Sequence, residues 1–186
     1  MSAALWALGR GTGVVALVLF TVSLVLGIVA RSGRPVPWLG RFGISDLHRT
    51  AALTGTGLVL AHVGTLLFDP YAQLRLVDLV FPFLGAYKPL WLGLGTLALD
   101  LLGVVTVVSL LRHRVGPRVF RAVHWATYAL WPVALLHALG NGTDGGSTWF
   151  RALAVVSISA VVTAVGWRLT PSYGQRGWIR HPRRTA

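Results

Sequence analysis

Long apolar stretches alternate with short polar segments along the whole chain. Five of these stretches carry few charges, and they cover about residues 12–30, 47–68, 90–111, 122–139 and 150–169. An α-helix needs about 20 apolar residues to cross the hydrocarbon layer of a bilayer, and each stretch is close to that length. The pattern predicts an all-α membrane protein, a single domain built as a bundle of five transmembrane helices. The first stretch is too long for the apolar part of a secretory signal, so we expect an uncleaved span.

Composition supports a membrane location. The 186 residues are 54% hydrophobic and only 12% charged, whereas soluble domains carry about 25% charged residues. The net charge is +12, and a basic chain can bind nucleic acid. Here the arginines lie between the apolar stretches, so membrane topology explains the charge and no nucleic-acid partner is expected.

The arginines also predict the orientation in the cell membrane. The excess lies in the first loop, the third loop and the C-terminal tail, as Arg31, Arg34, Arg41 and Arg49, then Arg112, Arg114, Arg118 and Arg121, then Arg176, Arg180, Arg183 and Arg184. The positive-inside rule places these segments in the cytoplasm and the N-terminus outside. The basic tail over 170–186 is expected to contact anionic lipid headgroups. The apolar loop over 69–89 is expected outside, as a short surface helix or as a lid on the bundle.

Four histidines lie inside these apolar stretches at nearly equal spacing. His48 and His62 are 14 residues apart, and His124 and His137 are 13 apart. Each pair spans roughly 20 Å of helix, and the second and fourth spans run parallel. His48 should therefore face His124 at the cytoplasmic level, with His62 facing His137 at the outer level. Neutral imidazole is a haem ligand, so these residues predict two haems b between the second and fourth spans. The chain has no cysteine, which excludes covalent attachment through a Cys-x-x-Cys-His motif.

Helical phase agrees for only one of the two pairs. Fourteen residues return to within about 40° of the starting face, whereas thirteen residues give about 220°. Pro132 lies between His124 and His137, and proline kinks a helix interior. We therefore predict that the fourth span bends or winds more tightly near Pro132.

Small residues accompany the histidines. Gly55 and Gly57 lie midway between the histidines of the second span, and Gly13 and Gly27 on the first span are also 14 residues apart. They could give the flat haem plates clearance. The alternative is ordinary close packing between helices, where glycine is common.

Four other side chains are candidates for the site. Trp131 lies midway between the histidines of the fourth span and could stand between the haems, or it could be a core residue. Arg49 and Arg121 flank the cytoplasmic ligands and could pair with haem propionates, or they could reflect positive-inside bias alone. Asp100 lies in the middle of the third span. A carboxyl there should be neutral or paired, as a proton relay, a ligand contact or a structural hydrogen bond.

The pattern resembles the ferric reductase-like transmembrane domain family, over about residues 11–169. The residues that carry the resemblance are His48-x13-His62, His124-x12-His137, and the local contexts Leu47-His48-Arg49 and His124-Trp125. That family includes the membrane cores of NADPH oxidases and ferric reductases and the haem subunit of the bacterial methionine sulfoxide reductase system. Many members have six helices and a cytoplasmic flavin and nicotinamide domain. This chain has five predicted spans and no Gly-rich dinucleotide fingerprint.

The resemblance implies that the chain is the haem-bearing membrane component of an oxidoreductase. Electrons would pass from a cytoplasmic donor, either a separate flavoprotein or a quinol, to an extracytoplasmic acceptor. The family's acceptors are ferric iron, oxygen or a partner reductase. One alternative is a quinol-linked respiratory-type cytochrome b, which would favour 14-residue spacing on both helices. The other is a structural or regulatory membrane subunit whose histidines link helices by hydrogen bonds.

Overall fold

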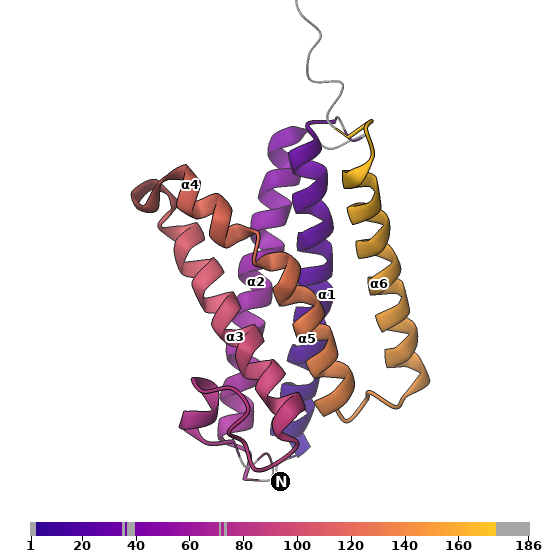
Figure 1. The fold of residues 1–186 in the computed structure, drawn as a ribbon. Helices are drawn as coiled ribbons and strands as arrows, with labels where there is room; N and C mark the ends of the chain where they lie inside the picture. Colours follow the sequence, from indigo (N-terminus) through magenta and orange to yellow (C-terminus); the bar gives the residue numbers. More distant parts are fainter. Residues whose placement is uncertain (1–2, 35, 37–39, 71, 73, 174–186) are drawn as a thin grey trace, which may run out of the picture.

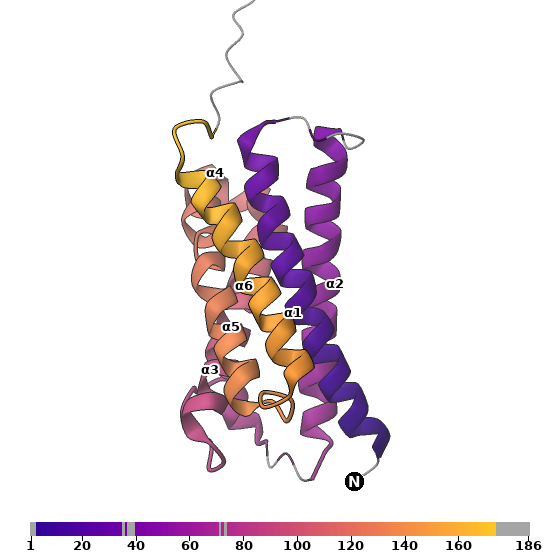
Figure 2. The same cartoon turned by 90° about the vertical axis from the view of Figure 1, so that its right-hand side faces the viewer.

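Six α-helices and one 3-10 turn make up the fold (Figures 1 and 2). The computed structural model describes residues 3–34, 36, 40–70, 72 and 74–173. Within them the elements are α1 (Ala3–Ser32), α2 (Arg41–Leu67), η1 (Leu76–Leu79), α3 (Pro89–Leu110), α4 (Arg112–His124), α5 (Thr127–Asn141) and α6 (Thr148–Leu169). Most of the predicted basic tail, from residue 174 onward, lies outside the described residues.

Four of the helices in the described part of the chain, α1, α2, α3 and α6, are long and apolar enough to cross a membrane. The outward face of α6 shows why lipid is the matching solvent, because Val155, Val156 and Val162 are each more than 60% exposed. The chain is therefore an all-α, multi-pass membrane protein. The predicted fourth span, 122–139, is not one continuous helix, and this corrects the expected count of five. Its residues are divided between the end of α4 and α5, which has 15 residues.

The division falls directly after His124 (Figure 1). The amides of Ala126, Tyr128 and Ala129 each bond to a carbonyl three residues earlier, at 2.9, 3.1 and 3.0 Å. This 3-10 winding turns the backbone by about 120° per residue instead of about 100°. Helix α5 continues through Pro132, so the predicted position of the bend is wrong. Proline nonetheless bears on this turn, because its ring crowds the carbonyl four residues earlier, that of Tyr128.

The helices pack as two pairs joined through α1. Helix α2 lies along α1, α3 lies along α5, and α1 also contacts α5 and α6. One core cluster joins α1, α5 and α6, and a second joins α3 and α5. Phe20 of α1 packs against both clusters, so this ring sits where the two pairs of helices meet.

Chain ends and loops separate into two groups. The end of α1, the start of α2, helix α4 and the end of α6 lie at one end of the bundle, and the start of α1, η1 and the α5–α6 connection lie at the other (Figure 1). The arginines of the first and third predicted cytoplasmic segments therefore share one end, as the alternation of the sequence implies. We call this the basic end and the opposite one the η1 end.

The apolar loop at the η1 end is a 3-10 turn that covers the start of α3. Asp78 is buried and accepts three hydrogen bonds from Arg75, through its backbone amide and its guanidinium, at 2.8 to 3.1 Å. Thr96 of α3 donates to the carbonyl of Asp78. Phe83 lies against Gly93, where a Cβ would come within 2.2 Å of its ring. Val80 and Phe81 stay exposed, which suits a turn at a membrane surface.

Removal of the Asp78 charge should loosen this turn. The Arg75 guanidinium holds the pKa of the Asp78 carboxyl below its usual value. The ion pair therefore stabilises the turn above about pH 4 and is lost as the pH falls through the lowered pKa of the folded state. We expect Asp78→Asn to be cleaved faster than wild type in this loop at pH 7 by an acid-tolerant protease. Wild type should approach the variant's rate at low pH; equal rates at both pH values would contradict the ion pair's role.

Candidate functional site

The structure brings each histidine of α2 next to one from the α4–α5 segment. At the basic end, the ring centroids of His48 and His124 are 6.1 Å apart, and their planes are inclined by 76°. At the η1 end, His62 is close enough to His137 for the two imidazoles to interact electrostatically. The four side chains thus form two pairs at two depths, with about 20 Å of α2 between them.

The His48–His124 separation suits two ligands on opposite sides of one metal. Nitrogen–metal bonds of about 2.0 Å, with each centroid about 1.1 Å behind its nitrogen, give a centroid separation of about 6.2 Å. No group of three or more metal-binding side chains occurs within the part of the chain that the structure describes. The protein therefore offers its imidazoles in twos, which suits a metal that brings its equatorial ligands with it, as haem iron does.

Three of the imidazoles have one ring nitrogen engaged by a backbone carbonyl. The Nδ1–H groups of His48, His62 and His137 donate to the carbonyls of Ser23, Gly9 and Trp91, at 2.8, 2.6 and 2.7 Å. A carbonyl oxygen only accepts, so the proton must reside on Nδ1. Nε2 then keeps its lone pair, and this is the nitrogen available to a metal.

His124 is held differently. Its Nδ1 is buried and has no hydrogen-bond partner among the described residues. Its ring stacks on Phe120, one turn earlier in α4, with centroids 5.2 Å apart and planes 26° apart. An unpartnered imidazole nitrogen at the end of a helix leaves this ring freer to rotate than the other three.

Gly55 and Trp131 lie at mid-depth but take part in helix packing. A Cβ added at Gly55 would come within 3.1 Å of the Phe20 ring, so this glycine admits a side chain of α1. Trp131 is 7% exposed, belongs to the core cluster of α1, α5 and α6, and donates its indole N–H to Thr21 at 2.9 Å. The structure thus supplies the core environment that the sequence left open. A position of Trp131 between two haems stays a prediction.

Arg49 and Arg121 lie at the basic end and are exposed. The Nε–H of Arg121 donates to the carbonyl of Pro117 in its own helix at 3.1 Å. Their proposed pairing with propionates stays a prediction that the exposed guanidinium groups allow.

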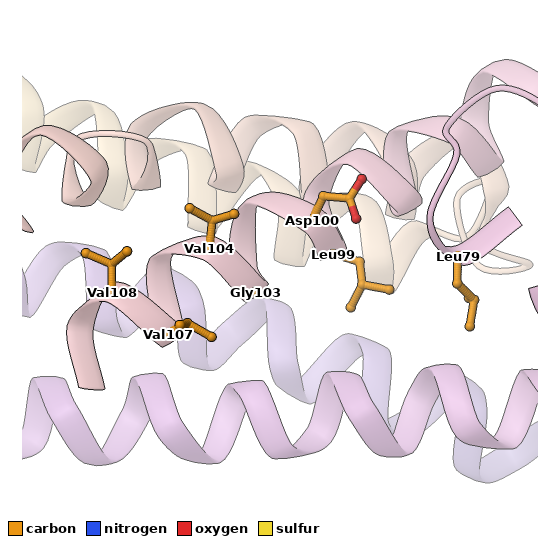
Figure 3. Close-up of a pocket in the computed structure, with 7 residues that line it drawn as sticks. All are labelled: Leu79, Leu99, Asp100, Gly103, Val104, Val107 and Val108. Atoms are coloured by element: carbon orange, nitrogen blue, oxygen red, sulfur yellow. The ribbon is translucent and has the colours of Figure 1, made fainter. Parts of the chain in front are cut away.

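Asp100 lines a groove on α3 together with apolar residues. Figure 3 shows its carboxyl in a groove of about 560 Å³ formed by Leu79, Leu99, Gly103, Val104, Val107 and Val108. Within the described residues the carboxyl makes no hydrogen bond or ion pair, so the structural hydrogen bond expected for it is absent. The groove runs along α3 toward Leu79 of η1 and does not include the histidines.

The fold and the paired imidazoles define a multi-pass helical membrane protein with two facing histidine sites. The profile of the family described as "Ferric reductase like transmembrane component" matches residues 12–135, which is more than half of the 186-residue chain. The chain belongs to this family, and the resemblance inferred from the histidine spacing is confirmed. No curated protein and no solved structure matches the chain.

The Thr21–Trp131 hydrogen bond should contribute measurably to stability. Thr21→Val keeps the shape but leaves the buried indole N–H without a partner, at a cost of about 1–3 kcal/mol. The unfolding midpoint in detergent should fall by about 2–4 °C for each kcal/mol. Thr56→Val is the control, because Thr56 donates to Ala52 of its own helix. Equal midpoints for the two variants would show that the interhelical bond has no effect.

Proposed function

We propose that this chain carries electrons across a cell membrane through two haems b, each held by one histidine of α2 and one of the α4–α5 segment. The observation that supports it best is the His48–His124 pair, whose centroid separation of 6.1 Å suits two axial ligands of one iron. Family membership supports the same reading, because ferric reductase-like membrane domains transfer electrons.

Each part of the chain has a physical task in this proposal. His48 and His124 would ligate the haem at the basic end, and His62 and His137 the haem at the η1 end. Haem iron supplies reversible one-electron transfer, with a potential set by its ligands and their surroundings. The carbonyl bonds to Nδ1 keep three rings in one tautomer, and the apolar core around Phe20 excludes water between the two levels. Arg49 and Arg121 would offset the charge of propionates at the basic end.

Direction and partners follow from the charge distribution. If the basic end faces the cytoplasm, the His48–His124 level receives electrons from a cytoplasmic donor, a separate flavoprotein or a quinol. The His62–His137 level then delivers them to an extracytoplasmic acceptor, which can be ferric iron, oxygen or a partner reductase. The chain would act as the haem-bearing membrane component of such an oxidoreductase.

Single histidine substitutions test the ligand assignment. Wild type purified from haem-replete cells should show reducible low-spin haem bands and two haems per chain by pyridine haemochrome assay. His48→Ala and His62→Ala should each hold one haem or fewer, because one axial ligand of one site is gone. His113→Ala is the matched control, since this histidine is exposed on α4 and should leave the haem content unchanged. Wild type without reducible haem would refute the proposal.

Cysteine labelling tests the orientation. The chain has no native cysteine, so single-cysteine variants have no background. Gly146→Cys, in the exposed α5–α6 connection, should react with a membrane-impermeant maleimide on intact cells. Arg114→Cys, exposed at the basic end, should react only after permeabilisation. The opposite pattern would reverse the proposed direction of electron flow.

A further inference from the structure

Three of the four histidines lie against a glycine of a neighbouring helix. His62 and His48 of α2 lie on Gly13 and Gly27 of α1, and His137 of α5 lies on Gly95 of α3. A Cβ added to these glycines would approach the ring atoms to 2.9, 3.2 and 2.5 Å, in that order. Each ring therefore occupies space that any other residue would fill with its side chain.

The hydrogen bonds follow the same arrangement. The acceptors for His62, His48 and His137 are the carbonyls of Gly9, Ser23 and Trp91. Each acceptor lies four residues before the glycine that its ring touches. In an α-helix that carbonyl also accepts the amide of the glycine, so its second lone pair serves the imidazole. Only where the Cβ is missing can the ring approach the helix closely enough to reach this carbonyl.

We infer that Gly13, Gly27 and Gly95 are positioning residues that seat the histidines, fixing both the ring orientation and the Nδ1–H tautomer so that Nε2 faces the metal. We call each glycine and the carbonyl four residues earlier a glycine seat. This inference rests on the proposed function and deepens it. His124 has no glycine seat: its Nδ1 is without a partner among the described residues, and Phe120 supports its ring. The two levels therefore differ, with both ligands seated at the η1 end and one at the basic end.

The effect of filling a glycine seat should be confined to one level. Gly27→Ala pushes on His48 and should disturb the basic-end haem, and Gly13→Ala and Gly95→Ala should disturb the haem at the η1 end. The contact at Gly95 is the closest of the three and the one at Gly27 the loosest, so severity should follow that order. Disturbance means a changed low-spin EPR signal and midpoint potential of one haem, up to loss of about half the haem.

Matched controls come from the same helices. A Cβ added at Gly11 of α1 or Gly103 of α3 would meet no atom within 4 Å. Gly11→Ala and Gly103→Ala should therefore leave haem content, EPR signals and both potentials as in wild type. The experiment uses the full chain purified with its haem, and it measures spectra, redox titration and haem per chain for all five variants.

A double substitution separates seating from a general folding defect. His48→Ala removes the ring that a Cβ at Gly27 would strike, so adding Gly27→Ala to His48→Ala should cause no further loss of yield or of the remaining haem. In the presence of His48 the same Gly27→Ala change should disturb the basic-end haem. Equal effects of Gly27→Ala in both backgrounds would overturn the inference, as would glycine-seat variants indistinguishable from the controls. If wild type holds no haem, it is the proposed function that fails.

Discussion

A neutral imidazole surrounded by apolar side chains needs a partner for its ring N–H, and this constraint organises the bundle. Where lipid replaces water, an unsatisfied donor is costly, and every polar group has to find its partner within the protein. Three of the four imidazoles solve this by donating to a backbone carbonyl of an adjacent helix. Such a bond requires close approach of ring and backbone, so the glycines of α1 and α3 and the pairing of α1 with α2 and of α3 with α5 belong to the same solution.

Helices α1 and α3 carry no histidine, yet they determine how the histidines are presented. Helix α1 provides two glycine seats, 14 residues apart, for the two rings of α2, and the antiparallel course of the helices pairs Gly13 with His62 and Gly27 with His48. The same helix contributes Phe20, which fills the space beside Gly55 at mid-depth. A change in α1 therefore reaches the site without altering a ligand, because ring position depends on the backbone behind the ring.

The sequence predicts the parts of this arrangement that depend on periodicity. The apolar stretches, the two levels of histidines and the family follow from spacing alone, and Gly13 and Gly27 attract attention because they repeat the 14-residue interval of His48 and His62. Their contact partners do not follow, since clearance for a haem plate and clearance for an imidazole require the same missing Cβ. Gly95 has no partner at that interval and is invisible without its neighbour α5. The break after His124 was predicted at Pro132, because proline marks the disturbed region but acts on the turn that precedes it.

That break explains why His124 differs from the other three ligand candidates. The 3-10 turn at Ala126–Ala129 removes the phase mismatch of a 13-residue interval only by ending α4 at the histidine itself. A residue at a helix end has no long neighbouring backbone alongside it, so no carbonyl reaches its Nδ1, and aromatic stacking on Phe120 takes over. A ring N–H that donates to a carbonyl makes imidazole a more basic ligand. The basic end therefore combines one strengthened and one unassisted ligand, whereas the η1 end has two strengthened ones. Stronger donation from both axial ligands favours the oxidised metal, so this asymmetry by itself lowers the potential at the η1 end relative to the basic end. Electron flow toward the η1 end would then need an opposing contribution from solvent exposure or from a partner at that surface.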